Sequence, residues 1–220
     1  MLYERLQCCD ELSLLDLSKM EVPGLRINFT DPNLWVAALC IGFNPLFWNV
    51  VARWEYRTHK LSRLFGSPYI GCYVLAVMIF FLGIYRDGRY RLALQSQPKS
   101  PELFSNWILW SGYVSILVGS MLVLTSFFTL GVTGTFLGDY FGILLDEKVT
   151  SFPFNIMDNP MYWGSTMNFF GVALIQASHA GLLLTLWVAV SYKIVIMFEG
   201  PFTEAIYSKK TKLKSNNHAD

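Results

Sequence analysis

The chain has 220 residues, of which 53% are hydrophobic and only 15% are charged. Soluble domains carry about a quarter charged residues, so this composition excludes an ordinary soluble domain. The net charge of +1 excludes the basic surface that nucleic acids require, and no nucleic-acid partner is expected. Long uncharged windows alternate with short charged ones, which predicts a helical integral membrane protein.

The N-terminal residues 1–31 are predicted to form an extension outside the membrane. They carry six acidic residues, and the apolar run 12–17 is too short for the core of a secretory signal. Cys8 and Cys9 are poor disulfide partners, and inert thiols are favoured over a palmitoylated pair. The expected organisation is this extension, a helical membrane domain over 32–200 and a basic tail over 201–220.

Two apolar regions follow the extension. The first, 34–52, barely reaches the length that crosses a bilayer, and Pro45 removes a backbone donor at its middle. It is predicted to embed in the membrane without crossing, with a full span as the alternative. The second region, 67–85, is uncharged and predicts a transmembrane helix.

Two further apolar regions lie in the second half of the chain. The third, 107–131, predicts a span that begins with interfacial tryptophans. The fourth, 166–197, is too long for one untilted span, and polar residues near His179 divide it into a partial helix over 166–177 and a span over 180–197. The predicted fold is all-α, with three transmembrane helices and one embedded N-terminal segment, or with four spans as the alternative.

Orientation is predicted from lysine and arginine in the loops. Region 86–104 and the tail are both basic, and they share one side if the third and fourth regions each cross once. The acidic loop 132–165 is then opposite, and the C-terminus is cytosolic. One basic cluster disagrees with this scheme, because it falls on the lumenal side: Arg53, Arg57, Lys60 and Arg63.

Several small or polar residues have structural as well as functional interpretations. Gly134, Gly138 and Gly142 are spaced as on a close-packing helix face, which is favoured over ligand contact. Ser111, Ser115 and Gly119 form a second such stripe. No histidine, cysteine and acid cluster has metal-ligand spacing, so no metal is expected. Tyr162 and Trp163 suit either an interfacial anchor or an aromatic cage for a quaternary ammonium group.

Five stretches closely resemble the animal phosphatidylethanolamine N-methyltransferases. They occur in the same order and with similar spacing over about residues 32–207, and they contain rare Trp, Pro and Asn residues in register. The stretches are FNPLFWNVVARWE (43–55), KLSRLFGSPY (60–69), GTFLGDYFGIL (134–144), FPFNIMDNPMYWGS (152–165) and FEGPFTEAIY (198–207).

The resemblance implies an enzyme that transfers methyl groups from S-adenosylmethionine to phosphatidylethanolamine in three steps, giving phosphatidylcholine. Its substrates would include the mono- and dimethyl lipids, and its location the endoplasmic reticulum and associated mitochondrial membranes. The family's cofactor motifs, Gly-x-Gly and Glu-Glu, map here to Leu117, Val118 and Gly119 and to Glu199 and Gly200. Leu117 and Gly200 depart from those motifs.

The chemistry needs a neutral lipid amine aligned with the methyl donor, and no metal. A base or water must accept the amine proton, and the candidates are Asp139, Asp158 and Glu199. Tyr162 and Trp163 would bind the amine as methyl groups accumulate. The alternatives are a related membrane methyltransferase with another acceptor, such as a prenylated cysteine, and a non-catalytic scaffold or transporter with a polar pathway at Gln176 and His179. The sequence leaves the oligomeric state open.

Overall fold

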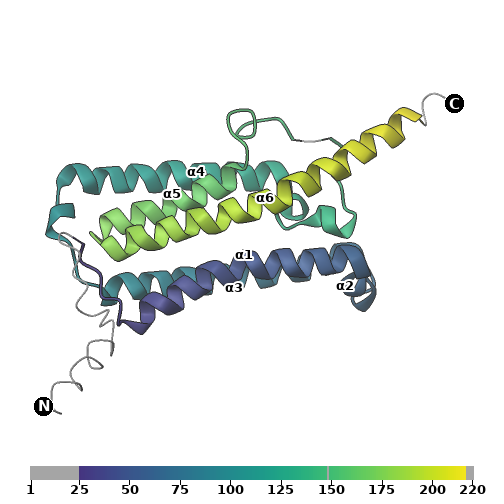
Figure 1. Ribbon diagram of the computed structural model, residues 1–220. Coiled ribbons are helices and arrows are strands. Elements are labelled where there is room, and N and C mark those ends of the chain that lie inside the picture. Colours follow the sequence, from purple (N-terminus) through teal and green to yellow (C-terminus); the bar gives the residue numbers. More distant parts are fainter. Residues whose placement is uncertain (1–24, 148, 217–220) are drawn as a thin grey trace, which may run out of the picture.

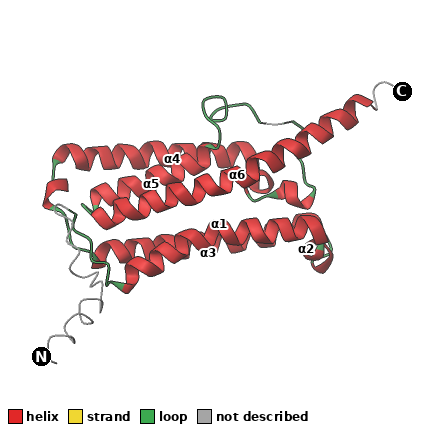
Figure 2. Ribbon diagram, viewed as in Figure 1, coloured by secondary structure: helices red, strands yellow, loops and turns green. Residues whose placement is uncertain are grey.

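The computed structural model describes residues 25–147 and 149–216, and every regular element in them is a helix (Figures 1 and 2). Four helices are long and apolar enough to cross a membrane: α1 (Pro32–Thr58), α3 (Pro68–Ser96), α4 (Asn106–Thr135) and α6 (His179–Asn216). Shorter elements are α2 (Lys60–Leu64), α5 (Pro160–Ile175) and the 3₁₀ turns η2 (Pro101–Leu103) and η3 (Gly138–Phe141). The all-helical membrane fold is confirmed, in its four-span form.

Helix α1 is continuous through Pro45, where the sequence favours a segment that dips into the membrane. Its 27 residues extend about 40 Å at 1.5 Å per residue, enough to cross a bilayer. Asp31 caps its first turn by accepting a 2.9 Å hydrogen bond from the Asn33 amide. Because α1 packs against both α3 and α6, tertiary contacts hold the helix together across the proline.

Helix α3 is longer than the predicted span 67–85. Arg86, Arg89 and Arg91 lie inside it, so the prediction that they belong to a loop is wrong. Two of them find polar partners on neighbouring helices. Arg86 donates to the Tyr192 hydroxyl in α6, and Arg89 donates to the Asn33 side chain in α1, each at 2.9 Å. These partners allow the arginines to remain in the helix.

The path of helix α5 contradicts the predicted placement of the loops relative to the tail. It runs back beside α4, so loop 136–159 lies at the same end of the bundle as the C-terminal part of α6 (Figure 1). Thr203 donates to Asp139, and Lys210 donates to the Leu145 carbonyl across this junction. The predictions that loop 132–165 lies opposite the tail and that region 86–104 shares the tail's side are therefore wrong, since α3 ends and α4 begins at the other end of the bundle. The turn 59–67 shares this end, which brings the basic cluster of Arg53 and Arg63 to the tail's side.

The break near His179 is confirmed. Helix α5 ends at Ile175, Ala177 has a positive φ of 47°, and α6 begins at His179. The Ser100 amide donates to the Ala177 carbonyl, and the Ser100 hydroxyl contacts His179 Nδ1 at 2.8 Å. The polar residues at the break therefore make contacts between elements, as expected for a turn inside a helical bundle.

The helices form two layers, α4, α5 and α6 in one and α1 and α3 in the other (Figure 1). Tyr90 of α3 joins the layers, since its hydroxyl donates to the Phe169 carbonyl of α5 and its ring packs edge-on against Phe169. Buried residues of α1, α3, α5 and α6 surround this contact and form the main core: Leu34, Ala37, Ile41, Ala93, Leu94, Ala180, Leu184, Val188 and Tyr192.

The predicted glycine face 134, 138 and 142 does not form. Gly131, with φ of 66°, breaks the helical conformation near the end of α4. Gly134 lies beyond that break, Gly138 opens η3, and Gly142 has φ of 77° just after it. The glycines at 131 and 142 therefore serve turns that need positive φ, and the chain leaves the helix between them. The calls on residues 1–24, including Cys8 and Cys9, lie outside the described residues.

Candidate active site

Glu199 of α6 is the centre of a polar cluster inside the bundle. Its Oε1 accepts hydrogen bonds from Trp48 Nε1 at 3.0 Å and from Asn49 Nδ2 at 2.9 Å. Its Oε2 accepts from the Tyr162 hydroxyl at 2.6 Å. All three partners are neutral donors, and together they suit an ionised carboxylate. The glutamate is therefore tied to α1 and α5, unlike a carboxylate that is only solvated at a helix end.

Local sequence explains how these partners reach Glu199. Trp48 and Asn49 follow Pro45 by about one turn on α1, and Asn49 Nδ2 also contacts the Pro45 carbonyl. Tyr162 stands in the first turn of α5, which starts after Asn159 with φ of 57° and continues through Pro160. Proline at the first helical position fixes the start of the helix. The turn thus directs Tyr162 inward, toward α6.

Aromatic and charged groups extend the cluster toward the tail. Arg53 donates to the Phe198 carbonyl at 2.8 Å and lies 5.8 Å from the rings of Phe198 and Phe202. The Phe202 ring stacks on Tyr140 at 3.9 Å. Asp139, beside Tyr140, accepts a 2.9 Å hydrogen bond from Thr203. A cation, two carboxylates and several ring faces therefore gather within a few turns of α6.

Two buried polar atoms in this cluster have no hydrogen-bond partner among the described residues. They are Asn49 Oδ1, on the side chain that donates to Glu199, and the Tyr140 hydroxyl. A buried polar atom without a partner costs about 1–3 kcal/mol. Such atoms beside a satisfied carboxylate are expected where a polar ligand completes the hydrogen bonding.

The predicted residues Leu117, Val118 and Gly119 lie on α4, and the structure does not bring them to Glu199. Leu117 is 71% exposed on the outer surface. Gly119 is buried against α5, where an added Cβ would lie 2.5 Å from the Gly164 carbonyl oxygen. Ser115, one turn earlier, donates to the Met167 carbonyl. Of the predicted stripe, Ser115 and Gly119 thus make the close helix contact, whereas Ser111 is exposed.

The remaining predicted residues separate into two groups. Tyr162 lies in the Glu199 cluster, but Trp163 is 59% exposed and faces away. Gly200 is exposed, with no atom within 4 Å of an added Cβ. Among the candidate proton acceptors, Asp139 and Glu199 belong to the cluster, and Asp158 lies exposed in the loop before α5.

Sequence reasoning missed the four residues that α1 and η3 bring to the cluster: Trp48, Asn49, Arg53 and Tyr140. All four fall inside stretches that carry the family resemblance, which was the available signal. Nothing in their spacing pairs them with Glu199, since about 150 positions separate Asn49 from it. Only the return of α6 beside α1 brings them together.

A hollow of about 350 Å³ opens at the opposite end of the bundle, between the end of α3 and the end of α5. It contains no carboxylate and lies far along α5 from Tyr162, so it is not part of the Glu199 cluster. Its lining residues are Arg91, Leu94, Gln95, Val172, Ile175 and Gln176. Among the described residues, no group of three histidine, cysteine or acidic side chains is placed to hold a metal ion.

Comparison with known proteins identifies one matching family and several similar enzymes. Residues 107–210 match the phospholipid methyltransferase family. The chain is 55% identical to phosphatidylethanolamine N-methyltransferase of Rattus norvegicus, over 84% of this chain and 92% of the relative. It is 52% identical to phosphatidyl-N-methylethanolamine N-methyltransferase of Emericella nidulans, over 87% and 93%. The enzyme of that name from Saccharomyces cerevisiae is 49% identical over 86% and 92%. No solved structure matches the chain.

Proposed function

This chain belongs to the phospholipid methyltransferase family, and we propose that it methylates the amine of phosphatidylethanolamine toward phosphatidylcholine, with S-adenosylmethionine as methyl donor. The observation that carries the proposal is the Glu199 cluster, a half-buried carboxylate that accepts three hydrogen bonds beside aromatic faces and unpartnered polar atoms in a helical membrane domain. The match extends over 92% and 93% of the length of two of these relatives, which supports the membrane domain as a whole as the catalytic unit.

The charged and polar groups of the cluster fit S-adenosylmethionine. Glu199 suits the ammonium or ribose hydroxyl groups of the cofactor, and Arg53 suits its carboxylate. The Asn49 Oδ1 and Tyr140 hydroxyl groups would gain the partners that they lack. When bound, the cofactor supplies a methyl group on a sulfonium, which is electrophilic without a metal. Direct cofactor contacts of Leu117, Val118, Gly119 and Gly200 rest on the resemblance alone, and the packing of Gly119 against α5 favours a supporting role for α4.

The residues of the chain position the reacting amine. The Tyr162 and Tyr192 rings lie 4.9 Å apart, next to the Glu199 carboxylate. Ring faces attract an ammonium group more strongly when water is excluded, so this pair suits the increasingly methylated amine. Holding the amine in line with the donor lowers the entropic part of the barrier. Asp139 and Glu199, the two carboxylates of this cluster, are the candidate acceptors of the amine proton.

Three successive methylations by one chain are part of the proposal. The chain is almost equally similar to relatives named for the unmethylated lipid and for the monomethyl lipid. An aromatic pair that binds by ring faces accepts each methylated amine, because it does not depend on a fixed number of N–H donors.

Labelled S-adenosylmethionine tests the activity directly. Microsomes from cells that lack their own phospholipid methylation but express the chain are expected to label mono-, di- and trimethylated phosphatidylethanolamine, resolved by chromatography. Label only in the di- and trimethyl lipids would restrict the chain to the later steps. Label in a protein ester, or in no lipid, would contradict the proposal.

We place the tail in the cytosol and the protein in the endoplasmic reticulum and associated mitochondrial membranes. The basic residues support this orientation, because Arg53, Arg57, Lys60 and Arg63 lie at the same end as the tail lysines. The Glu199 cluster lies toward that end, where cytosolic S-adenosylmethionine arrives without crossing lipid. Cysteine labelling from the cytosol tests the tail, with a cysteine placed at Lys209 expected to react and one at Glu102 expected to be protected.

A further inference from the structure

A charged side chain deep in the bundle has no part in the site described above. Arg86 lies on α3, about 15 Å along the axis from the end of that helix at Ser96. Its side chain is only 12% exposed, and its guanidinium lies 5.0 Å from the Phe169 ring. Arginine within a membrane span costs several kcal/mol, so its presence there points to a functional site.

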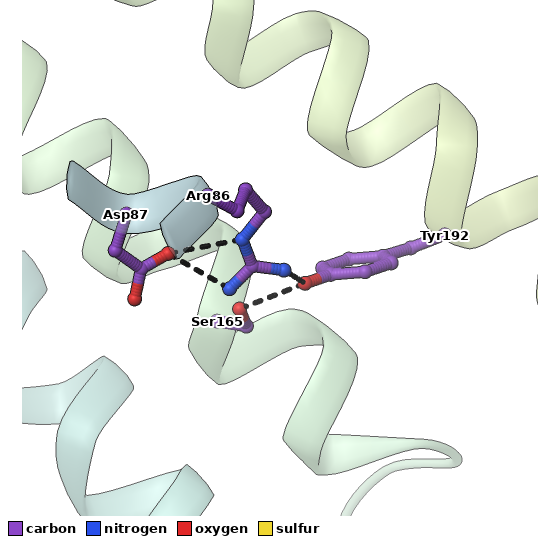
Figure 3. A network of polar contacts seen from close by, with 4 residues as sticks. All are labelled: Arg86, Asp87, Ser165 and Tyr192. Atoms are coloured by element: carbon purple, nitrogen blue, oxygen red, sulfur yellow. Dashed lines mark hydrogen bonds and ion pairs between the residues drawn. The ribbon is translucent and has the colours of Figure 1, made fainter. Parts of the chain in front are cut away.

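The partners of Arg86 leave part of its binding capacity unused (Figure 3). Nε and Nη2 both contact a single oxygen, Asp87 Oδ1, at 2.9 Å. Nη1 donates to the Tyr192 hydroxyl at 2.9 Å. Each terminal nitrogen carries two hydrogens, so one on each has no acceptor in the part of the chain that the structure describes. Asp87 itself is 53% exposed, so its carboxylate has room to turn away from Arg86 when another anion takes its place.

Arg86 is connected to the proposed catalytic cluster through two tyrosines. The Tyr192 hydroxyl, which accepts from Arg86, also contacts the Ser165 hydroxyl at 3.1 Å (Figure 3). The Tyr192 ring packs against Tyr162, and the Tyr162 hydroxyl donates to Glu199. Tyr192 and Glu199 are seven residues apart on α6, about 10 Å along the helix. The tyrosine pair therefore lies between the cation and the carboxylate.

We propose that Arg86 binds the phosphodiester of the lipid substrate and so places its amine against the Tyr162–Tyr192 pair. The inference rests on the proposed function, because the phosphate is the anionic group next to the amine in phosphatidylethanolamine. A guanidinium binds a phosphodiester through two parallel N–H bonds. The two-carbon ethanolamine arm then extends from Arg86 toward the tyrosine rings, where the methyl group is received.

The chemistry of the partners favours phosphate binding over a purely structural ion pair. Residues adjacent in sequence gain little fold specificity from an ion pair, and both charges here come from α3. A structural pair would need both charges equally. A phosphate site needs Arg86 and is hindered by Asp87, which competes for the same hydrogens.

The test compares Arg86→Gln and Asp87→Asn with Arg91→Gln, which removes an exposed arginine from the same helix. Purified protein in nanodiscs receives phosphatidylethanolamine at several surface concentrations, and S-adenosylmethionine binding is measured in parallel. Arg86→Gln is expected to raise KM for the lipid at least tenfold with cofactor affinity unchanged. Asp87→Asn is expected to leave KM equal or lower, and Arg91→Gln to leave it unchanged.

A lipid without the phosphate charge separates binding from folding effects. The methyl phosphotriester of phosphatidylethanolamine keeps the amine but has no anion, so wild type is expected to use it at least tenfold less efficiently than the diester. Arg86→Gln is expected to treat the two lipids alike, and Arg86→Lys to keep a partial preference. Equal use of both lipids by wild type, or equal losses in Arg86→Gln and Asp87→Asn, would overturn the inference. If the proposed function itself is wrong, wild type labels neither lipid.

Discussion

Helix α5 is flanked by two contacts of opposite character. On one side it packs against α4 through small residues, and Gly119 of α4 meets Gly164 of α5 backbone to backbone. On the other side, Tyr162 of α5 meets Glu199 of α6 through a side-chain hydrogen bond, among aromatic rings and unpartnered polar atoms. The first contact has no room for an added methyl group, and the second has unused donors and acceptors.

This difference distinguishes the two parts of the cofactor site that the family resemblance implies, residues 117–119 on α4 and residues 199–200 on α6. A glycine-to-glycine contact between membrane helices is what close packing requires. A carboxylate with three donors in a membrane domain carries a desolvation cost that packing does not explain. We therefore propose that α4 acts on the reaction by holding α5 in place and that Glu199 and its partners contact the cofactor.

At the contact between α5 and α6, removing the charge of Glu199 has the largest expected effect on cofactor affinity. Glu199→Gln keeps one carbonyl acceptor for Trp48 and Asn49 but loses the anion. Hydrogen bonds to charged groups contribute about 1.5–3 kcal/mol, so affinity for S-adenosylmethionine should fall about 100-fold by isothermal titration calorimetry. Glu204→Gln, five residues later on an exposed position of α6, is the control and should bind normally. Normal binding by Glu199→Gln would remove Glu199 from the site.

A methyl group at Gly119 tests the close contact between α4 and α5. Gly119→Ala places a Cβ within 2.5 Å of the Gly164 carbonyl and Asn168 Oδ1, so α4 and α5 must separate. Overpacking of this kind costs about 1–3 kcal/mol, and thermal unfolding in detergent should show a lower Tm. Gly83→Ala is the matched control, since no atom lies within 4 Å of its added Cβ. A Tm for Gly119→Ala at or above that of Gly83→Ala would contradict the close contact.

The Tyr162 hydroxyl joins the two sides, because it extends from α5 to Glu199. Tyr162→Phe keeps the ring but removes one donor to the carboxylate, a loss of about 1.5 kcal/mol or about tenfold in cofactor affinity. The expected change appears in KM for S-adenosylmethionine, with the lipid saturating. Tyr113→Phe, on an exposed face of α4, should leave KM unchanged. Equal KM values for the two variants would show that the hydroxyl does not support the cofactor site.

Asp31 lies outside both contacts and tests the stability of the helical bundle that contains them. Burial opposes ionisation of Asp31, but hydrogen bonds from Ser96, Asn33 and Gln97 outweigh it and lower its pKa. Its stabilising effect is therefore present above the pKa of the unfolded chain and is lost as pH falls through the folded value. Asp31→Ala should cost about 1 kcal/mol near neutral pH, measured by thermal unfolding. The cost should shrink in acid, and a cost independent of pH would contradict the ionised cap.

Apolar runs predicted most of the helices, because hydrocarbon requires a continuous stretch of apolar residues. The turn at Gln176 to Ser178 was also predicted, since polar residues interrupt the run there. Pro45 misled the prediction for α1, because the contacts of α1 with α3 and α6 outweigh one lost hydrogen bond. Arg86, Arg89 and Arg91 misled the prediction for α3, because Arg86 and Arg89 donate hydrogen bonds to neighbouring helices and Arg91 lies exposed near the helix end.

The site was less accessible to sequence reasoning than the fold. Glu199 came from the family resemblance, and its partners on α1 and α5 depend on contacts between residues 37 to 151 positions apart. The 16 residues of α5 are short for a span, and the return of this helix across the bundle brings loop 136–159 to the tail's end, contrary to the prediction. The missed partners of Glu199 and the misplaced loop both depend on long-range packing, which no local pattern of residues encodes.

Binding of labelled S-adenosylmethionine to Glu199→Gln and Gly119→Ala, at a temperature where both are folded, decides whether the cofactor depends on Glu199 or on α4. Gly119→Ala, although less stable, is expected to bind with an affinity near that of wild type. Glu199→Gln should lose about 100-fold in affinity, with a Tm within about 4 °C of wild type. The opposite pattern, with affinity lost in folded Gly119→Ala and kept in Glu199→Gln, would move the cofactor to α4 and contradict the account.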